Sequence, residues 1–390
     1  MNAWETRKLG EVLKLEYGKP LPEKSRDGGG EYPAYGANGV KCWSNQYYFD
    51  KQSIIVGRKG SAGEVNITDG KFWPLDVTYF VTYDSTQYDL TFLYHCLRHL
   101  RLTKLAKGVK PGINRNDVYQ IEFAFPPLPE QKRIVSIVDQ AFEGIDRAIA
   151  NTKKNLTNAR ELFESYLNAV FTQKSDRWEE KTLHEVSSYF GRGKSKHRPR
   201  NDPKLYGGSY PFIQTGDVRN CSHVITEYSQ FYSEAGLAQS KLWPKGTICI
   251  TIAANIAETG ILGFDACFPD SVIGIVVNNE LTSNDFVEYL LQSVKARIKA
   301  KGKGSAQDNI NMATFENEKF PFPHLNQQRA IVDSLNQLSS ETQRLETIYQ
   351  QKLTVLNELK QSILQKAFTG ELTADIANQT TKKAEEAIAA

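Results

Sequence analysis

The spacing of apolar residues predicts two long helices in this chain. The clearer one lies toward the C-terminus, where ten positions step by alternating four and three residues. These positions are Ile331, Leu335, Leu338, Thr342, Leu345, Tyr349, Lys352, Leu356, Leu359 and Ile363. A heptad pattern sustained for about nine turns is typical of a helix that packs along a second helix. A helix of roughly 40 residues spans about 60 Å at 1.5 Å per residue.

The same register predicts an earlier helix in the middle of the chain. Its positions are Ile134, Val138, Ala141, Ile145, Ala148, Thr152, Asn155, Ala159, Leu162 and Tyr166. The polar residues Thr152 and Asn155 weaken this seam, so we expect the helix to be stabilised by packing against a partner. Two amphipathic helices of equal length in one chain most simply pack against each other, and we expect them to run antiparallel.

A sequence repeat explains why the two helices match. LPEQKRIVSIVDQ starts at Leu128 and aligns without a gap with LNQQRAIVDSLNQ, which starts at Leu325; the alignment continues over forty residues. WETRKLGEV at Trp4 likewise returns as WEEKTLHEV at Trp178. The chain is therefore organised as a globular unit and a long helix, followed by a second globular unit and a second long helix.

Each globular unit carries mixed signals. Strand-like runs such as SIIVGRKG, GTICITIA and SVIGIVVN are separated by turn residues, and a helical segment follows late in each unit. We therefore predict two pseudo-repeated α/β globular domains that alternate with two long α-helices, which form an antiparallel coiled coil. The predicted ranges are 1–127 and 174–323 for the globular domains, 128–173 and 324–370 for the helices, and 371–390 for a tail expected to be partly disordered.

The composition excludes several classes of protein. The chain has 390 residues, a net charge of +3 and five scattered cysteines without a CxxC spacing. This cysteine pattern favours reduced thiols over a disulfide framework or a zinc site. The sequence contains neither an apolar run of membrane-spanning length nor a recognisable signal peptide. We therefore expect a cytoplasmic protein that has no contact with a membrane.

Motifs that would indicate catalysis are weak. GRGKS at Gly191 resembles a phosphate-binding loop, but Ser188 stands where that loop requires a glycine. HCLRH places His95 and His99 one helical turn apart, without the glutamate or the third ligand of a zinc hydrolase. We therefore expect structural or surface histidines, no metal site and no catalytic residue in this chain.

Basic residues form three runs. One in the first unit comprises Arg98, Arg101, Lys104, Lys107, Lys110 and Arg115, and one in the second unit comprises Lys295, Arg297, Lys299, Lys301 and Lys303. The third, RGKSKHRPR, has Arg192, Lys194, Lys196, Arg198 and Arg200 at every second position. In an extended chain such alternation puts all five on one side. Cations of this kind neutralise phosphates, although a solvated surface is the alternative for any one run.

Forked and amide side chains near these runs are candidates for reading bases. They are Asn114, Arg115 and Asn116 in the first unit, and Gln307, Asn309 and Asn311 in the second. The segment GRKGSAG, which starts at Gly57, adds Arg58 and Lys59. Its glycines indicate either a tight turn or a loop whose backbone approaches a ligand closely.

The phrases PLPEQKRIV and LNQQRAIV, each leading into a heptad helix after a globular unit, resemble those of specificity subunits of type I restriction–modification enzymes. FTGEL at Phe368 also resembles the end of the second helix in that family. The resemblance covers nearly the whole chain. It is strong in the helices and the domain order, and weak inside the globular units.

The resemblance implies that each globular unit is a target-recognition domain for one half of a split, asymmetric site in double-stranded DNA. It implies that the helices set the distance between half-sites and dock two modification subunits. It also implies that this chain binds no cofactor. S-adenosylmethionine is then expected on the modification subunits, and ATP and Mg on further partners that include the restriction subunits.

Two other functions stay open on the residues alone. A coiled-coil scaffold would bind only protein and would have no salt-sensitive affinity for DNA. A DNA-modifying enzyme with an unrecognised motif would turn over DNA without any partner subunit.

Overall fold

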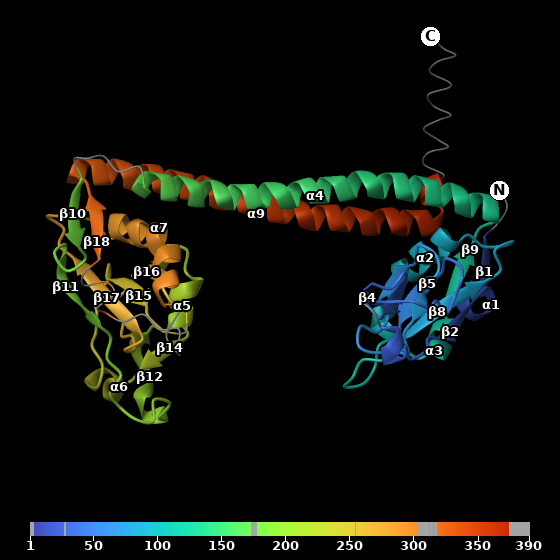
Figure 1. The fold of residues 1–390 in the computed structure, drawn as a ribbon, viewed down its shortest axis with the longest axis horizontal. Helices are drawn as coiled ribbons and strands as arrows, with labels where there is room; N and C mark the ends of the chain where they lie inside the picture. The colour runs from blue at the N-terminus through green and yellow to red at the C-terminus, as the bar shows by residue number, and fades with distance from the viewer. Residues whose placement is uncertain are drawn as a thin grey trace, which may run out of the picture. The chain divides into compact units, whose positions relative to one another are not determined.

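The computed structural model describes residues 4–26, 29–172, 178–253, 255–302, 312, 315 and 318–373. It divides into two compact units: residues 1–153 with 351–390 form unit 1, and residues 154–350 form unit 2. Each unit therefore combines one globular domain with parts of both long helices (Figure 1). No helix among the described residues has the length and apolar character needed to cross a bilayer. The predicted tail lies largely outside the described residues.

The globular part of unit 1 is built on an antiparallel sheet with the order β2-β8-β5-β6. Its strands are β2 (Leu13–Tyr17), β5 (Ile54–Gly57), β6 (Val65–Ile67) and β8 (Thr78–Tyr83). A second sheet holds β3 (Tyr32–Gly36), β4 (Gly39–Ser44) and β7 (Trp73–Pro74), and a ribbon pairs β1 (Glu5–Lys8) with β9 (Glu122–Phe125). The helices are α1 (Leu9–Val12), η1 (Glu23–Ser25), α2 (Leu90–His99), η2 (Leu102–Leu105) and α3 (Arg115–Tyr119).

Unit 2 repeats this plan with additions. Its main sheet has the order β11-β17-β15-β16-β13, formed by β11 (Ser187–Arg192), β13 (Val224–Ile225), β15 (Ile248–Thr251), β16 (Thr259–Leu262) and β17 (Val272–Val277). Ribbons pair β10 (Glu179–Thr182) with β18 (Lys319–Phe322), and β12 (Tyr206–Phe212) with β14 (Gln230–Tyr232). The helices are η3 (Pro203–Leu205), α5 (Thr215–Asn220), α6 (Glu234–Ala238) and α7 (Asn284–Gly302). The repeated tryptophan phrases both lead into the ribbon that closes their unit.

The two long helices are α4 (Leu128–Thr172) and α9 (Leu325–Thr369). In unit 1, Lys360 Nζ on α9 lies 2.5 Å from Asp146 Oδ1 on α4. In unit 2, Arg160 Nη2 on α4 lies 2.9 Å from Glu346 Oε2 on α9. Unit 1 thus holds the N-terminal part of α4 beside the C-terminal part of α9, and unit 2 holds the C-terminal part of α4 beside the N-terminal part of α9. The predicted antiparallel pairing is confirmed within each unit.

The predicted apolar seam is wrong toward the C-terminal end of α4. Leu162 and Tyr166, which the heptad register places on the seam, are exposed. Phe163, Leu167 and Phe171 instead pack into the core of unit 2. Here the helix packs on a globular domain as well as on another helix, so the apolar face follows the natural period of about 3.6 residues and drifts off a 3.5-residue register. On α9, the predicted seam residues Leu345 and Leu359 are likewise exposed.

Each globular domain contacts a long helix through a residue at the same position of the sequence repeat. On α4, Asp139 Oδ1 lies 2.9 Å from Nε2 of the buried His95, which belongs to α2. On α9 the matching residue is Asn336, whose Oδ1 accepts a 2.7 Å hydrogen bond from the hydroxyl of Tyr289 on α7. The late helix of each globular domain therefore makes a polar contact with the equivalent residue of a long helix, through different side chains in the two units.

Candidate DNA interface

The structure brings the GRKGSAG segment and the basic loop of unit 1 together. The backbone N–H of Ile113 donates to the carbonyl of Arg58 at 3.0 Å, and the N–H of Gly60 donates to the carbonyl of Pro111 at 3.1 Å. Lys59 also forms a β-bridge with Gly112. Two segments about fifty residues apart in the sequence thus form one basic surface, which we call the unit 1 loop pair (residues 57–63 and 107–116).

The glycines of GRKGSAG serve this packing. Gly63 has a φ of +86°, and a Cβ atom there would lie 2.3 Å from the backbone nitrogen of Thr103. Gly60 has a φ of +80°, in the left-handed region that favours glycine. The backbone of this segment therefore approaches its own chain closely, which supports the tight-turn interpretation of its glycines.

The cations of the unit 1 loop pair differ in how freely they face solvent. Lys59, Lys107 and Lys110 are exposed, as is Lys104 on η2. Lys107 Nζ lies 3.2 Å from Asp117 Oδ2 in a surface ion pair, a class of contact that contributes little. These ammonium groups are therefore accessible to an incoming phosphate.

The ring of Tyr17 packs against two arginines of the unit 1 loop pair. The guanidinium carbons of Arg58 and Arg115 lie 5.4 Å and 4.8 Å from the centre of its ring. Arg58 also donates to the carbonyl of Asp76 at 2.6 Å, and Arg115 donates to the carbonyl of Leu15 at 3.3 Å. Tyr17 was not predicted as a site residue, because nothing in its local sequence distinguishes it from the many core aromatics.

The three candidate amide and guanidinium readers of unit 1 lie at the start of α3. Asn114 caps this helix, since its side chain accepts a 2.9 Å hydrogen bond from the N–H of Asn116. Its amide group is therefore partly committed to structure. Asn116 is exposed, and Arg115 is half-buried against Tyr17.

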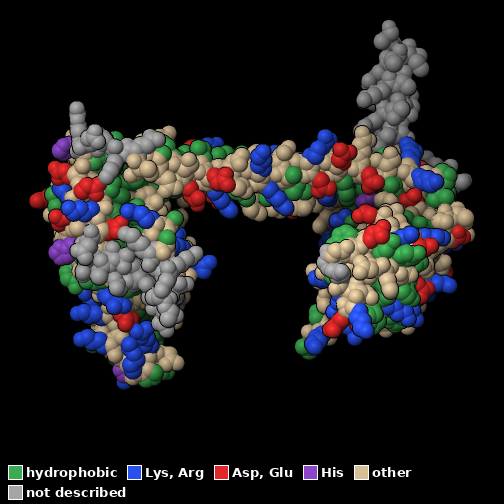
Figure 2. Space-filling model, viewed as in Figure 1, with side chains coloured by type: hydrophobic (Ala, Val, Ile, Leu, Met, Phe, Trp, Pro, Cys, Tyr) green, Lys and Arg blue, Asp and Glu red, His purple; other side chains and the backbone are tan. Residues whose placement is uncertain are grey.

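The alternating run of unit 2 is extended, with alternating burial, from Gly191 to Lys196, and the chain bends from Arg198 onward. Gly191, Gly193 and Ser195 are buried, whereas the basic residues between and beyond them are exposed. These exposed residues are Arg192, Lys194, Lys196, Arg198 and Arg200. Lys and Arg side chains gather on the part of unit 2 that carries β12 and α6 (Figures 1 and 2).

The arginines of this run are held by the protein, and its two lysines extend outward. Arg192 donates to the carbonyl of Asp270 at 2.9 and 2.6 Å, and Arg200 reaches the carboxylate of the same residue at 2.9 Å. Arg198 donates to two carbonyls of its own loop, at 2.7 and 2.8 Å. The arginine side chains therefore stabilise the conformation of this run, and Lys194 and Lys196 face solvent.

Three cations of the basic run on α7 form ion pairs within the chain. Lys295 Nζ and Lys299 Nζ lie 2.5 Å and 2.9 Å from the two carboxylate oxygens of Glu258. Burial raises the pKa of Glu258, but hydrogen bonds and charges from these two lysines outweigh burial and lower it below its usual value. Arg297 pairs with the little-exposed Glu318 at 2.8 Å. Lys299 thus faces a carboxylate of its own chain.

The remaining candidates of unit 2 cannot be placed. Lys301 belongs to α7, but its side chain is not among the described ones. Lys303, Gln307, Asn309 and Asn311 lie outside the described residues.

The two histidines of HCLRH have structural partners. His95 contacts Asp139, and its ring packs edge-on against Phe142 at 5.6 Å between centroids. The ring of His99 lies 5.1 Å from that of Phe368. Within the described part of the chain, no group of three or more His, Cys, Asp and Glu side chains is arranged to hold a metal ion.

Comparison with known proteins identifies the family. The model of the type I restriction modification DNA specificity domain matches residues 1–158 and 175–355. The EcoDI specificity subunit of Escherichia coli is 24% identical, over 95% of this chain and 89% of its own length. The StySPI specificity subunit of Salmonella potsdam is 31% identical, over 68% of this chain and 62% of its own length.

Solved structures share the fold. A chain from a study of complex assembly and conformational transition of the type I R-M system matches with a TM-score of 0.75 at 19% identity, covering 95% of this chain and 99% of that one. The HsdS subunit from Thermoanaerobacter tengcongensis matches with a TM-score of 0.57 at 20% identity, covering 95% and 98%. With the family match over both halves, this chain belongs to the type I restriction–modification DNA specificity family and is the non-catalytic specificity subunit, which recognises DNA sequence.

Proposed function

We propose that each globular domain of this chain reads one half of a bipartite, asymmetric DNA site, and that α4 and α9 set the spacing between the halves. The observation that carries this proposal is the repeated plan of the two units. Equivalent strands have the same order in both main sheets, and each late helix is fastened to a long helix at an equivalent residue. A plan used twice, with different basic loops, suits two different half-sites.

We also propose that the long helices dock two copies of a modification subunit. Leu162 on α4 and Leu359 on α9 occupy equivalent positions in the repeat, and their exposed fractions are 56% and 45%. An apolar side chain left exposed at the same place in both repeats supports one partner bound twice. Tyr166, Ile348 and Val355 add exposed apolar surface to the same helices.

The reactions then belong to the partners. We propose that the modification subunits bring S-adenosylmethionine, that ATP and Mg act on partner subunits including the restriction subunits, and that the complex works in the cytoplasm. The role of this chain is to bring those subunits to one DNA sequence.

Methylome sequencing tests the proposal. The chain is expressed with its modification subunits in a host without other methyltransferases. We expect methylated adenines in a motif of two short, different half-sites separated by unspecified bases. A contiguous motif, or methylation that does not change when the unit 1 domain is exchanged for that of a relative, would contradict the bipartite assignment.

A further inference from the structure

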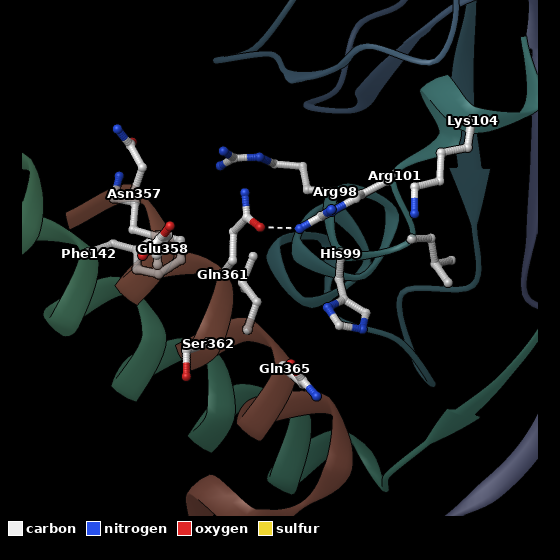
Figure 3. A pocket seen from close by; sticks show the side chains of 13 residues that line it. Arg98, His99, Arg101, Lys104, Phe142, Asn357, Glu358, Gln361, Ser362 and Gln365 are labelled. Atoms are coloured by element: carbon white, nitrogen blue, oxygen red, sulfur yellow. Dashed lines mark hydrogen bonds between the residues drawn. The ribbon is translucent and has the colours of Figure 1, made fainter. Parts of the chain in front are cut away.

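A cleft of about 570 Å³ lies within unit 1, between the end of α2 and the C-terminal part of α9 (Figure 3). One wall carries three cations, Arg98, Arg101 and Lys104. The opposite wall on α9 carries neutral polar side chains, which are Asn357, Gln361, Ser362 and Gln365. Arg101 has a φ of +49°, which is rare for a residue other than glycine, and its guanidinium donates to Gln361 across the cleft.

Among the described residues, the positive charge of this cleft exceeds its negative charge. Arg98 contacts the hydroxyl and the ring of Tyr94, at 3.3 Å and 5.4 Å, and Arg101 contacts an amide oxygen. No carboxylate among the described residues forms an ion pair with Arg98, Arg101 or Lys104. The other cation of the lining, Lys360, pairs with Asp146, and Glu358 is the acidic residue of the lining.

Unit 2 has the equivalent cleft, with a volume of about 510 Å³. The sequence repeat places Glu164, Leu167 and Asn168 of that cleft where unit 1 has Gln361, Leu364 and Gln365. Its two lysines, however, share the carboxylate of Glu258, and Arg219, the third cation of that lining, contacts the amide oxygen of Asn255 at 3.4 Å. The cleft is therefore part of the shared plan. Among the described residues, three cations of the unit 1 lining have no ion pair, against Arg219 alone in unit 2.

We propose that the unit 1 cleft binds a backbone phosphate of double-stranded DNA. Arginine, lysine, amide and hydroxyl groups are the usual protein donors to phosphate oxygens. The cations also continue along the chain at Lys107 and Lys110 into the unit 1 loop pair, which suits an extended polyanion better than one small anion. This inference rests on the proposed function and adds to it a contact that fixes position without reading sequence.

The test uses the complex of this chain with its modification subunits. It measures the affinity of that complex for a DNA duplex that carries the recognition site, at several salt concentrations. Replacing Arg98 and Arg101 by Gln should lower the slope of log affinity against log salt by about one to two, with the preferred sequence unchanged. Gln361→Glu adds a negative charge to the cleft and should also lower this slope, without altering either arginine. This variant replaces the double variant if the latter folds poorly. Exposed Lys8 and Lys51 line neither the cleft nor the loop pair, and their replacement by Gln is the charge-matched control.

A second arm locates the phosphate. Duplexes with one neutral methylphosphonate at each successive backbone position should reveal one position that weakens the wild-type complex several-fold and leaves the Arg98 and Arg101 variant unaffected. Slopes equal to the control, without such a position, would overturn the proposal. Competition by inorganic phosphate at constant ionic strength, again without such a position, would assign the cleft to a small anion and also overturn it. Failure of the wild-type complex to bind its duplex would instead contradict the proposed function.

Discussion

Gln131 and Gln328 occupy the same buried position in the two units, and each donates a 2.8 Å hydrogen bond to the carbonyl of the proline five residues before it. Those prolines are Pro126 and Pro323, which precede α4 and α9. Both amides also donate hydrogen bonds to the loop before the late helix of their own domain, to the carbonyls of Gln87 and Leu281. The repeated glutamine therefore joins the start of a long helix to a globular domain.

Gln328→Leu should destabilise unit 2. The side chain of Gln328 accepts from Thr282 at 2.8 Å and also donates to the carbonyl of Leu281 at 3.0 Å. Leucine would leave these buried groups without partners, so we expect a loss of about 2–4 kcal/mol in the free energy of unfolding. Urea unfolding measures this loss. Exposed Gln327→Leu is the control, and an equal loss in both variants would contradict the role of the buried amide.

His223 should make the stability of unit 2 depend on pH. Its Nε2 lies 2.8 Å from Asp285 and its Nδ1 lies 2.6 Å from Glu288, whose side chain is fully buried. Burial lowers the pKa of His223, but the hydrogen bonds and charges of the two carboxylates outweigh it and raise the pKa to about 9. The stabilisation is thus fully present below the unfolded pKa of about 6.5 and is lost as pH rises toward 9.

Unfolding of the wild-type chain and of His223→Gln from pH 6 to pH 9.5 measures this effect. We expect the wild type to lose on the order of 1–3 kcal/mol across that range, and the variant to be less stable at pH 6 with a flatter profile. Exposed His184→Gln should retain the wild-type profile. A wild-type profile that is flat or that rises with pH would be inconsistent with the doubly paired histidine.

Lys110 and Lys299 should differ in their effect on DNA binding. Lys110 is exposed in the unit 1 loop pair, whereas Lys299 lies 2.9 Å from Glu258. We expect Lys110→Gln to remove about one phosphate contact, which lowers the slope of log affinity against log salt by about 0.9. Lys299→Gln should change this slope little. Fluorescence anisotropy at several salt concentrations measures both. Equal slopes for the two variants would mean that the ion pair with Glu258 opens on binding.

The sequence predicted the parts of this fold that depend on local periodicity. The two long helices and the repeat follow from spacing along the chain. The exposure of Arg192, Lys194 and Lys196 follows from strand alternation, which ends where the chain bends at Arg198. The structure confirmed the antiparallel pairing. It also showed that Arg58 and Lys59 contact the basic loop. The sequence could not predict this contact, because it depends on how distant segments pack together.

Tertiary packing decided what the sequence could not predict. Glu258 pairs with both Lys295 and Lys299 from 37 and 41 residues away, so the sequence alone does not show how much of the charge of a basic run is offset in the fold. The exposed positions of Leu162 and Tyr166 depend on which side of α4 packs on unit 2. The role of Tyr17 likewise depends on two arginines that are distant in the sequence.

The central claim, that the paired helices set the distance between two half-sites, is tested most directly by lengthening them. Seven residues are inserted into each helix, between Lys153 and Lys154 and between Gln350 and Gln351, where the two units meet along the chain. At 1.5 Å per residue this adds about 10 Å, or roughly three base pairs of DNA at about 3.4 Å each. Methylome sequencing should then return the same two half-sites with a spacer longer by that amount. Unchanged half-sites with an unchanged spacer would contradict the claim.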